Sequence, residues 1–182
     1  NQLRIKNFKK FESLGFPTKK QENWKYTDLK TIINNNFEEL QIYTDKKKLE
    51  FNTKSLIKNF EHNSVILLNG NFIESNFNFE DKKKVTIKSL RSVLENKNDF
   101  EKIKTYFDDD QNSLISLNHA LVHDGVILQV EDDYSFIKPL VIYNFFDETA
   151  EEKIINNKVF ISLGNNSNLS LVDFYKCENN IK

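Results

Sequence analysis

The first third of the chain has apolar residues at roughly helical spacing, with lysines between them. Such spacing predicts an amphipathic helix over residues 3–14 that presents one apolar stripe. Gly15 follows as the expected C-terminal cap, and Pro17 prevents continuation of the helix. A second short helix is predicted over residues 22–33, because its apolar residues could line one side. The stripe of the first helix consists of Ile5, Phe8, Phe11 and Leu14.

The middle of the chain alternates between strand and helix signals. Two apolar runs flank Asn69 and Gly70, which predicts a β-hairpin because both turn residues accept positive φ. Residues 85–87 predict a further short strand, after which Ser89 can cap a helix. Residues 113–122 predict one more helix.

From Asp124 and Gly125 onward the pattern changes from helical to strand-like. Apolar residues alternate with period two, and Asn, Gly and Asp turns separate the segments. Residues 140–146 are apolar on both faces, which predicts a strand covered on both sides. A β-sandwich, an edge of a barrel and the first turns of a solenoid all fit this pattern. The segments are VILQV at 126–130, LVIYNFF at 140–146, KVFISL at 158–163 and NLSLVDFY at 168–175.

Composition excludes some classes of partner. The chain has 182 residues, of which 38% are hydrophobic and 13% aromatic, so we expect a folded protein with a buried core. A net charge of -1 gives no overall field to attract nucleic acid or an anionic membrane. No apolar run approaches the ~20 residues that span a bilayer. We therefore expect neither nucleic acid nor membrane as a partner.

The cysteine and methionine content bears on the cellular compartment of the protein and on whether the sequence is part of a longer one. Cys177 is the only cysteine, which fits a reducing compartment such as the cytoplasm or the stroma of a plastid-type organelle. The first residues lack the apolar region of a signal peptide. The sequence contains no Met and ends just after a strand-like segment, so we expect it to be part of a longer protein.

No set of residues in the sequence amounts to an active site. His119 and His123 are four apart, as in zinc proteases, but the residues between them lack the Glu that acts as base in H-E-x-x-H. Partly buried imidazoles at a helix end are the favoured interpretation. His62 is expected at the surface, and Cys177 has no CxxC partner. We therefore predict no catalytic residue, no metal ligand, no cofactor-binding residue and no enzymatic activity for this chain.

Residues 16–30 and three later segments occur in an order that resembles the amino-terminal half of the SufD family, subunits of the SUF iron-sulfur cluster assembly machinery. The early family motif has Pro-Thr followed by Glu-x-Trp-basic-Tyr-Thr, and a later one reads LN-x-A-L-x-x-DG. The later segments are VILLNGNFIES at 65–75, VTIKSL at 85–90 and SLNHALVHDGVILQV at 116–130. The residues that match these motifs, with structural roles expected for them, are Pro17, Thr18, Glu22, Trp24, Lys25, Tyr26, Thr27, Asn118, Asp124 and Gly125.

The resemblance implies an α+β fold in two parts. An amino-terminal helical α/β domain is expected over residues 1–124, followed over residues 125–182 by the first rungs of a right-handed parallel β-helix. The implied role is a scaffold rather than a catalyst: family members pair with the SufB paralogue and the SufC ATPase, and the complex assembles an iron-sulfur cluster transiently. The family's cluster ligands lie further along the chain, so the resemblance implies no bound cofactor here. A carbohydrate-active β-helix protein and a generic protein-interaction domain stay open as alternatives.

Two roles are conceivable for the aromatic residues of the early motif. Trp24 could stack on a ligand, or Trp24 and Tyr26 could anchor the second helix on the first while Pro17 fixes the corner between them. The polar residues around Trp24 favour the packing interpretation.

Overall fold

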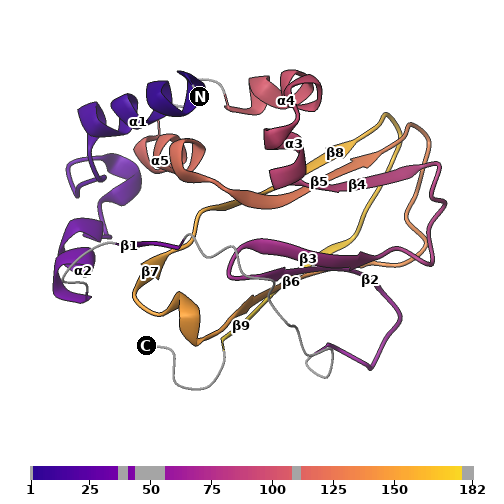
Figure 1. Ribbon diagram of the computed structural model, residues 1–182. Coiled ribbons are helices and arrows are strands. Elements are labelled where there is room, and N and C mark those ends of the chain that lie inside the picture. Colours follow the sequence, from indigo (N-terminus) through magenta and orange to yellow (C-terminus); the bar gives the residue numbers. More distant parts are fainter. Residues whose placement is uncertain (1, 37–40, 44–55, 108–111, 178–182) are drawn as a thin grey trace.

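The computed structural model describes residues 2–36, 41–43, 56–107 and 112–177. Most of the helices gather along one side of the molecule, and the two main β-sheets lie one above the other beside them (Figure 1). The described residues form a mixed α+β fold with three separate sheets, none of which closes into a barrel.

Helices form the amino-terminal part of the chain and return in its middle. They are α1 (Gln2–Leu14), α2 (Leu29–Asn36), α3 (Leu90–Glu95), α4 (Lys97–Ile103) and α5 (Ser113–Leu121), with 3₁₀ turns η1 (Glu22–Trp24), η3 (Lys104–Phe107) and η4 (Glu148–Ala150). Side-chain caps fix several of the helix starts. Ser89 Oγ accepts the N–H of Ser92, as its position before α3 predicts, and Asn112 Oδ1 accepts the N–H of Leu114 at the start of α5.

The strands form two main sheets and one short parallel pair. They are β1 (Gln41–Ile42), β2 (Asn63–Leu68), β3 (Asn71–Asn76), β4 (Val85–Ser89), β5 (Asp124–Val130), β6 (Leu140–Phe146), β7 (Lys153–Ile154), β8 (Asn157–Leu163) and β9 (Leu171–Cys177). The larger sheet has the order β3-β2-β6-β9, and the smaller one has the order β4-β5-β8. The pairs β2–β3 and β4–β5 are antiparallel, whereas β2–β6, β6–β9, β5–β8 and β1–β7 are parallel.

After residue 123 the chain passes through the two main sheets twice in the same order. β5 lies in the smaller sheet and β6 in the larger one, and then β8 returns beside β5 and β9 beside β6. Asp124 lies opposite Asn157, 33 residues later, and Leu140 lies opposite Leu171, 31 residues later. The strands predicted for this part of the chain are therefore confirmed.

The main core lies between the two sheets. Alternate residues of facing strands fill it, among them Val65 and Leu67 of β2 and Val126 and Leu128 of β5. The opposite face of β5 presents Ile127 to a second apolar cluster, which includes buried residues of α3, α4 and η3. Because β5 and β6 are covered on both faces, their sequences are nearly continuous apolar runs, as predicted for residues 140–146.

Two turns form where the sequence predicts them. Asn69 and Gly70 have φ of 49° and 76° and join β2 to β3, so the predicted hairpin is confirmed. Gly15 has a φ of 66°, and its N–H donates to the carbonyl of Phe11 at 2.7 Å. Gly15 therefore ends α1 as expected for a C-terminal cap.

The single apolar stripe predicted for α1 is wrong. Residues three apart on an α-helix are rotated by about 60° from each other, so the apolar positions turn by about half a circle between Ile5 and Leu14. Ile5 and Phe8 are exposed, whereas Asn7 is buried and donates from Nδ2 to the carbonyl of Phe107 at 3.2 Å. The side of α1 that carries Asn7 is therefore the side that the rest of the protein covers.

The second predicted helix is interrupted. Residues 22–33 contain the short turn η1 and then the first half of α2, which continues to Asn36. Asp28 separates the two elements, because its Oδ1 accepts the N–H of Thr31 at 3.0 Å and so caps α2.

Strands on both sides of the predicted boundary at residues 124 and 125 share the same sheets. β2 pairs with β6, and β4 pairs with β5. The core between the sheets therefore contains residues of both predicted parts, while the division into two domains stays a prediction.

Candidate functional site

The motif residues fall into two groups that α5 connects. The first group lies in the turn between α1 and α2, where Pro17 is buried and Trp24 is half-buried. Asn112 and Ser113, at the amino-terminal end of α5, line the same pocket as this turn. Asn118, further along α5, belongs to the second group, which continues into β5. One helix thus touches both groups.

A pocket of about 440 Å³ opens between the turn and α5. Leu14, Pro17 and Trp24 provide its apolar wall. The rest of the lining consists of amide and hydroxyl groups and one carboxylate, which suits the binding of an amphipathic group better than acid–base chemistry. The polar lining residues are Gln21, Glu22, Asn23, Asn112 and Ser113.

Tyr26 projects from the turn with 90% of its surface exposed. The Nζ of Lys25 lies 5.4 Å from the centroid of the Tyr26 ring, within the range of a cation–π contact. The hypothesis that Tyr26 anchors α2 on α1 is therefore wrong, whereas Trp24 is half-buried and lines the pocket together with Leu14 of α1. Thr18 and Thr27 are also exposed.

Asp124 is a buried carboxylate that joins three elements. Its Oδ2 accepts the N–H of Phe72 in β3 at 3.1 Å. Its Oδ1 accepts the Ser89 hydroxyl at 2.9 Å and the N–H of Arg91 at 3.1 Å, both at the start of α3. The guanidinium of Arg91 lies 3.7 Å from Asp124. This motif residue therefore fixes the hairpin and α3 to the first residue of β5.

Gly125 and Asn118 lie against the start of β8, where the chain returns to the smaller sheet beside β5. Gly125 has a φ of 140°, and a Cβ built on it would overlap the carbonyl of Lys158 in β8. The Nδ2 of Asn118 donates to the carbonyl of Asn157 at 3.2 Å. Both motif residues thus act where α5 and β5 meet the start of β8.

The two histidines near the end of α5 do not share a helical face. The helix ends at Leu121, so His123 lies beyond it, with its ring centroid 6.4 Å from that of Tyr43. The ring of His119 instead packs against Phe107, at 5.3 Å. Burial lowers the pKa of His123, and neighbouring arginine charges act in the same direction. Within the described ranges, no group of three or more His, Cys, Asp or Glu residues could hold a metal ion.

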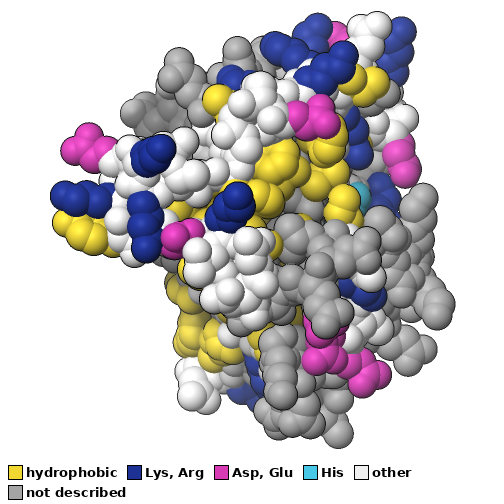
Figure 2. All heavy atoms as spheres, turned by 90° about the vertical axis from the view of Figure 1, so that its left-hand side faces the viewer, with side chains coloured by type: hydrophobic (Ala, Val, Ile, Leu, Met, Phe, Trp, Pro, Cys, Tyr) yellow, Lys and Arg dark blue, Asp and Glu magenta, His cyan; other side chains and the backbone are white. Residues whose placement is uncertain are grey.

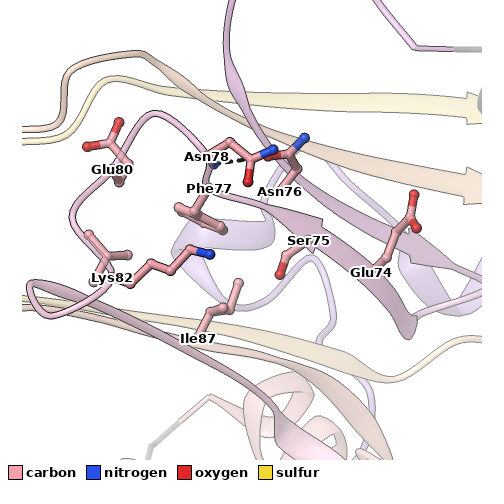
Figure 3. A pocket seen from close by; sticks show the side chains of 9 residues that line it. Glu74, Ser75, Asn76, Phe77, Asn78, Glu80, Lys82 and Ile87 are labelled. Atoms are coloured by element: carbon pink, nitrogen blue, oxygen red, sulfur yellow. Dashed lines mark hydrogen bonds between the residues drawn. The ribbon is translucent and has the colours of Figure 1, made fainter.

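A second pocket, of about 500 Å³, opens between the edge strands β3 and β4. Figure 3 shows the side chain of Lys82 ending between Phe77 and Ile87, with Glu74 on the other side of the opening. The described residues that line this pocket include the apolar Phe77 and Ile87. They also include a positive charge on Lys82 and a negative charge on Glu74. This arrangement can bind a small amphipathic group, but it places no nucleophile beside a base.

Glu80, which also lines the second pocket, is a buried carboxylate that sequence reasoning missed. It accepts hydrogen bonds from Asn63 Nδ2 at 2.6 Å, from the Tyr134 hydroxyl at 2.8 Å and from the N–H groups of Ile137 and Lys138 at 3.2 Å. Burial alone would raise the pKa of Glu80, but these hydrogen bonds outweigh it and leave the pKa below its ordinary value. The partners lie 17 to 58 residues away, so no local pattern marks the site.

His62 is half-buried at the surface, and it has a distant partner that its polar neighbours do not suggest. The hydroxyl of the fully buried Tyr143 lies 2.7 Å from Nε2 of His62, and Nδ1 lies 2.9 Å from the carbonyl of Phe60. The histidine therefore covers the outer face of the larger sheet. Cys177 is exposed at the end of β9.

A family model described as the SufBD protein N-terminal region matches residues 1–142, which include both groups of motif residues. No curated protein matches the chain. In the part of the chain that the structure describes, no helix has the length and apolarity needed to cross a bilayer.

Proposed function

The chain belongs to the SufB/SufD family of iron-sulfur cluster assembly proteins through the N-terminal region that they share, and on this premise we propose that it is a non-catalytic scaffold subunit of the SUF machinery. It works with a SufB-like paralogue and a SufC-like ATPase. The observation that carries the proposal is the family match over residues 1–142. The geometry of the motif residues supports it, because Asp124, Gly125 and Asn118 hold parts of the fold together.

Within the family, we assign the chain to SufD rather than to SufB. The assignment rests on the turn between α1 and α2, where Pro17, Glu22 and Trp24 line one pocket in the order of the SufD motif. Lys25, Tyr26 and Thr27 complete that motif in the sequence.

The strands after residue 123 are the first rungs of a right-handed parallel β-helix. The offsets of 33 residues between β5 and β8 and 31 between β6 and β9 support this proposal. The turns keep the same spacing, since Asp132 Oδ1 accepts the N–H of Asn165, 33 residues later, at 2.6 Å. Stacking of equivalent residues in successive coils is the defining contact of a solenoid.

The iron-sulfur cluster is the cargo of the assembled complex, and we assign no cluster ligand to the described residues. The proposed location is the cytoplasm or the stroma of a plastid-type organelle. We do not propose the carbohydrate-active alternative, because the family match over residues 1–142 gives it no support.

Co-purification tests the scaffold role. The full-length protein that contains this chain is expressed with the SufB-like and SufC-like proteins of the same genome under reducing conditions. Recovery of a complex of all three with a tag on this protein is the expected result. A folded, full-length protein that retains neither partner would overturn the proposal. Retention of the SufC-like ATPase without the paralogue, in a self-paired complex, would favour SufB over SufD.

A further inference from the structure

The turn between α1 and α2 combines an exposed aromatic side chain with a pocket. Tyr26 stands out from the turn, and Trp24 lines the pocket together with Leu14 and Pro17. Aromatic side chains beside a concave apolar site are typical anchors of protein–protein contacts. The contact with Lys25 still leaves 90% of the Tyr26 surface exposed, so most of the ring is available to a partner.

The same part of the chain is basic, although the whole chain is not. Residues 1–36 contain eight Lys and Arg residues and three Asp and Glu residues, whereas the complete chain contains 26 and 27. Lys20 and Lys25 are exposed in the turn itself. Asp28 is engaged, because it caps α2 and lies 3.6 Å from Lys19. Figure 2, which views this side of the molecule, shows Lys and Arg side chains beside exposed hydrophobic ones.

We propose that this surface, formed by Leu14, Pro17, Trp24, Tyr26 and the lysines of the turn, docks an acidic amphipathic segment of a partner protein. An apolar side chain of the partner enters the pocket and contacts Trp24, while Tyr26 covers it from outside. Carboxylates of the partner meet Lys20 and Lys25, so charge complementarity guides the encounter. The inference is independent of the proposed scaffold role, because it rests on the exposure, shape and charge of this surface alone.

Shape and composition favour a protein segment over a bilayer or a nucleic acid. The pocket is concave and partly lined by the amide groups of Gln21 and Asn23, which can bind a peptide backbone but would lose their contact with water in lipid. The basic residues of the turn are all Lys, so the surface lacks the guanidinium forks that read phosphates and bases.

Trp24 is the only tryptophan of the chain, so its fluorescence reports binding at this surface directly. The probe is a synthetic helical peptide with Leu on one face and Glu on the other and without aromatic residues. A matched peptide carries Lys in place of Glu. We expect a saturable change of Trp24 emission with the Glu peptide, and an affinity at least about tenfold weaker for the Lys peptide. Raising NaCl from 50 to 500 mM should also weaken binding of the Glu peptide.

Substitutions at this surface and at control positions test whether the Glu peptide binds here. The change Tyr26→Ser and the double change Lys20→Glu/Lys25→Glu should each weaken the affinity for the Glu peptide at least about fivefold, since both remove partner contacts at exposed positions. Matched controls are Ile137→Ser, at a residue that is 64% exposed elsewhere, and Lys83→Glu/Lys84→Glu, at exposed lysines that line neither pocket. Both controls should bind like the unchanged chain.

Several outcomes would overturn the proposal. They are the absence of a saturable response to the Glu peptide, equal binding of the Lys peptide, and variants of the turn that bind like the controls. Titrations with phosphatidylserine vesicles and with a single-stranded oligonucleotide complete the test. A Tyr26-dependent response to either probe that is stronger than the response to the Glu peptide would reassign the surface to membrane or nucleic acid.

Discussion

Gly125 lies directly opposite Lys158 in the parallel register of β5 and β8, and the two backbones approach so closely that a side chain on Gly125 has no room. The φ of 140° at Gly125 is also one that other residues rarely adopt. The Asp-Gly pair of the later family motif therefore has a physical explanation: Asp124 secures the start of β5 from inside, and Gly125 lets β8 pack beside it.

Replacing Gly125 should weaken the packing of β8 beside β5. Gly125→Ala is expected to lower the free energy of unfolding by more than about 2 kcal/mol, through backbone strain and overlap with Lys158. Gly15→Ala is the matched control, because Gly15 also has a positive φ but a Cβ there would meet nothing within 4 Å. It should cost only about 1 kcal/mol. Urea denaturation measures both values, and equal losses would contradict the role given to Lys158.

The buried carboxylate of Asp124 should contribute more to stability than its ion pair with Arg91 alone would, because it also accepts three hydrogen bonds. Asp124→Asn keeps the shape but turns one acceptor into a donor that faces the N–H groups of Phe72 or Arg91. We expect the free energy of unfolding to fall by about 2 to 4 kcal/mol in urea denaturation.

Asp99→Asn is the control for this substitution. Asp99 forms ion pairs with the exposed Lys88 and Lys102 at the protein surface, where such pairs contribute little. If the two substitutions lower the free energy of unfolding equally, the hydrogen bonds of Asp124 stabilise the fold no more than a surface ion pair does.

The parts of the fold that the sequence predicts are those set by local chemistry. The hairpin at Asn69 and Gly70 follows from the φ angles that these residues accept, and the start of α3 follows from the Ser89 side chain. The continuous apolar run of β6 likewise predicts burial on both faces. In each case the structure depends on contacts between residues close in sequence or on the order of apolar residues within one segment.

The features that the sequence does not predict depend on distant partners. His62 is tied to Tyr143, 81 residues away, and Glu80 to Lys138, 58 residues away. The exposure of Ile5 and Tyr26 likewise depends on which sides of α1 and of the following turn the rest of the chain covers. The spacing of residues states which side chains share a face, but tertiary packing decides which face is buried.

The Glu80 carboxylate should make stability depend on pH. Its hydrogen bonds hold the pKa in the folded state below the value in the unfolded chain, so the unfolded chain binds the proton more readily. The resulting stabilisation is fully present above the unfolded-state pKa, near 4.5, and is lost as the pH falls through the lower folded-state pKa.

Glu80→Gln should remove this dependence. The variant is expected to be less stable than the unchanged chain at pH 7, and the difference between them should shrink as the pH is lowered from 5 to 3. Urea denaturation at several pH values measures the difference. Glu61→Gln serves as control, because Glu61 is exposed and its ion pair with Lys138 lies at the surface. A difference that stays constant from pH 7 to pH 3 would rule out a Glu80 carboxylate stabilised by these bonds.

The strands β8 and β9 should cause the isolated chain to associate. Among the described residues, each is the last strand of its sheet, and Leu171 of β9, which continues the core row of Leu140, is 47% exposed. Such an edge offers unpaired backbone groups and apolar side chains to another chain. We expect sedimentation velocity to show reversible association that grows with concentration and that Leu171→Lys reduces, because a charge at this edge opposes strand pairing. Ile137→Lys, at an exposed apolar residue in the loop before β6, should leave association unchanged. A chain that stays monomeric at every concentration, or equal effects of the two lysines, would show that this edge is not the site of association.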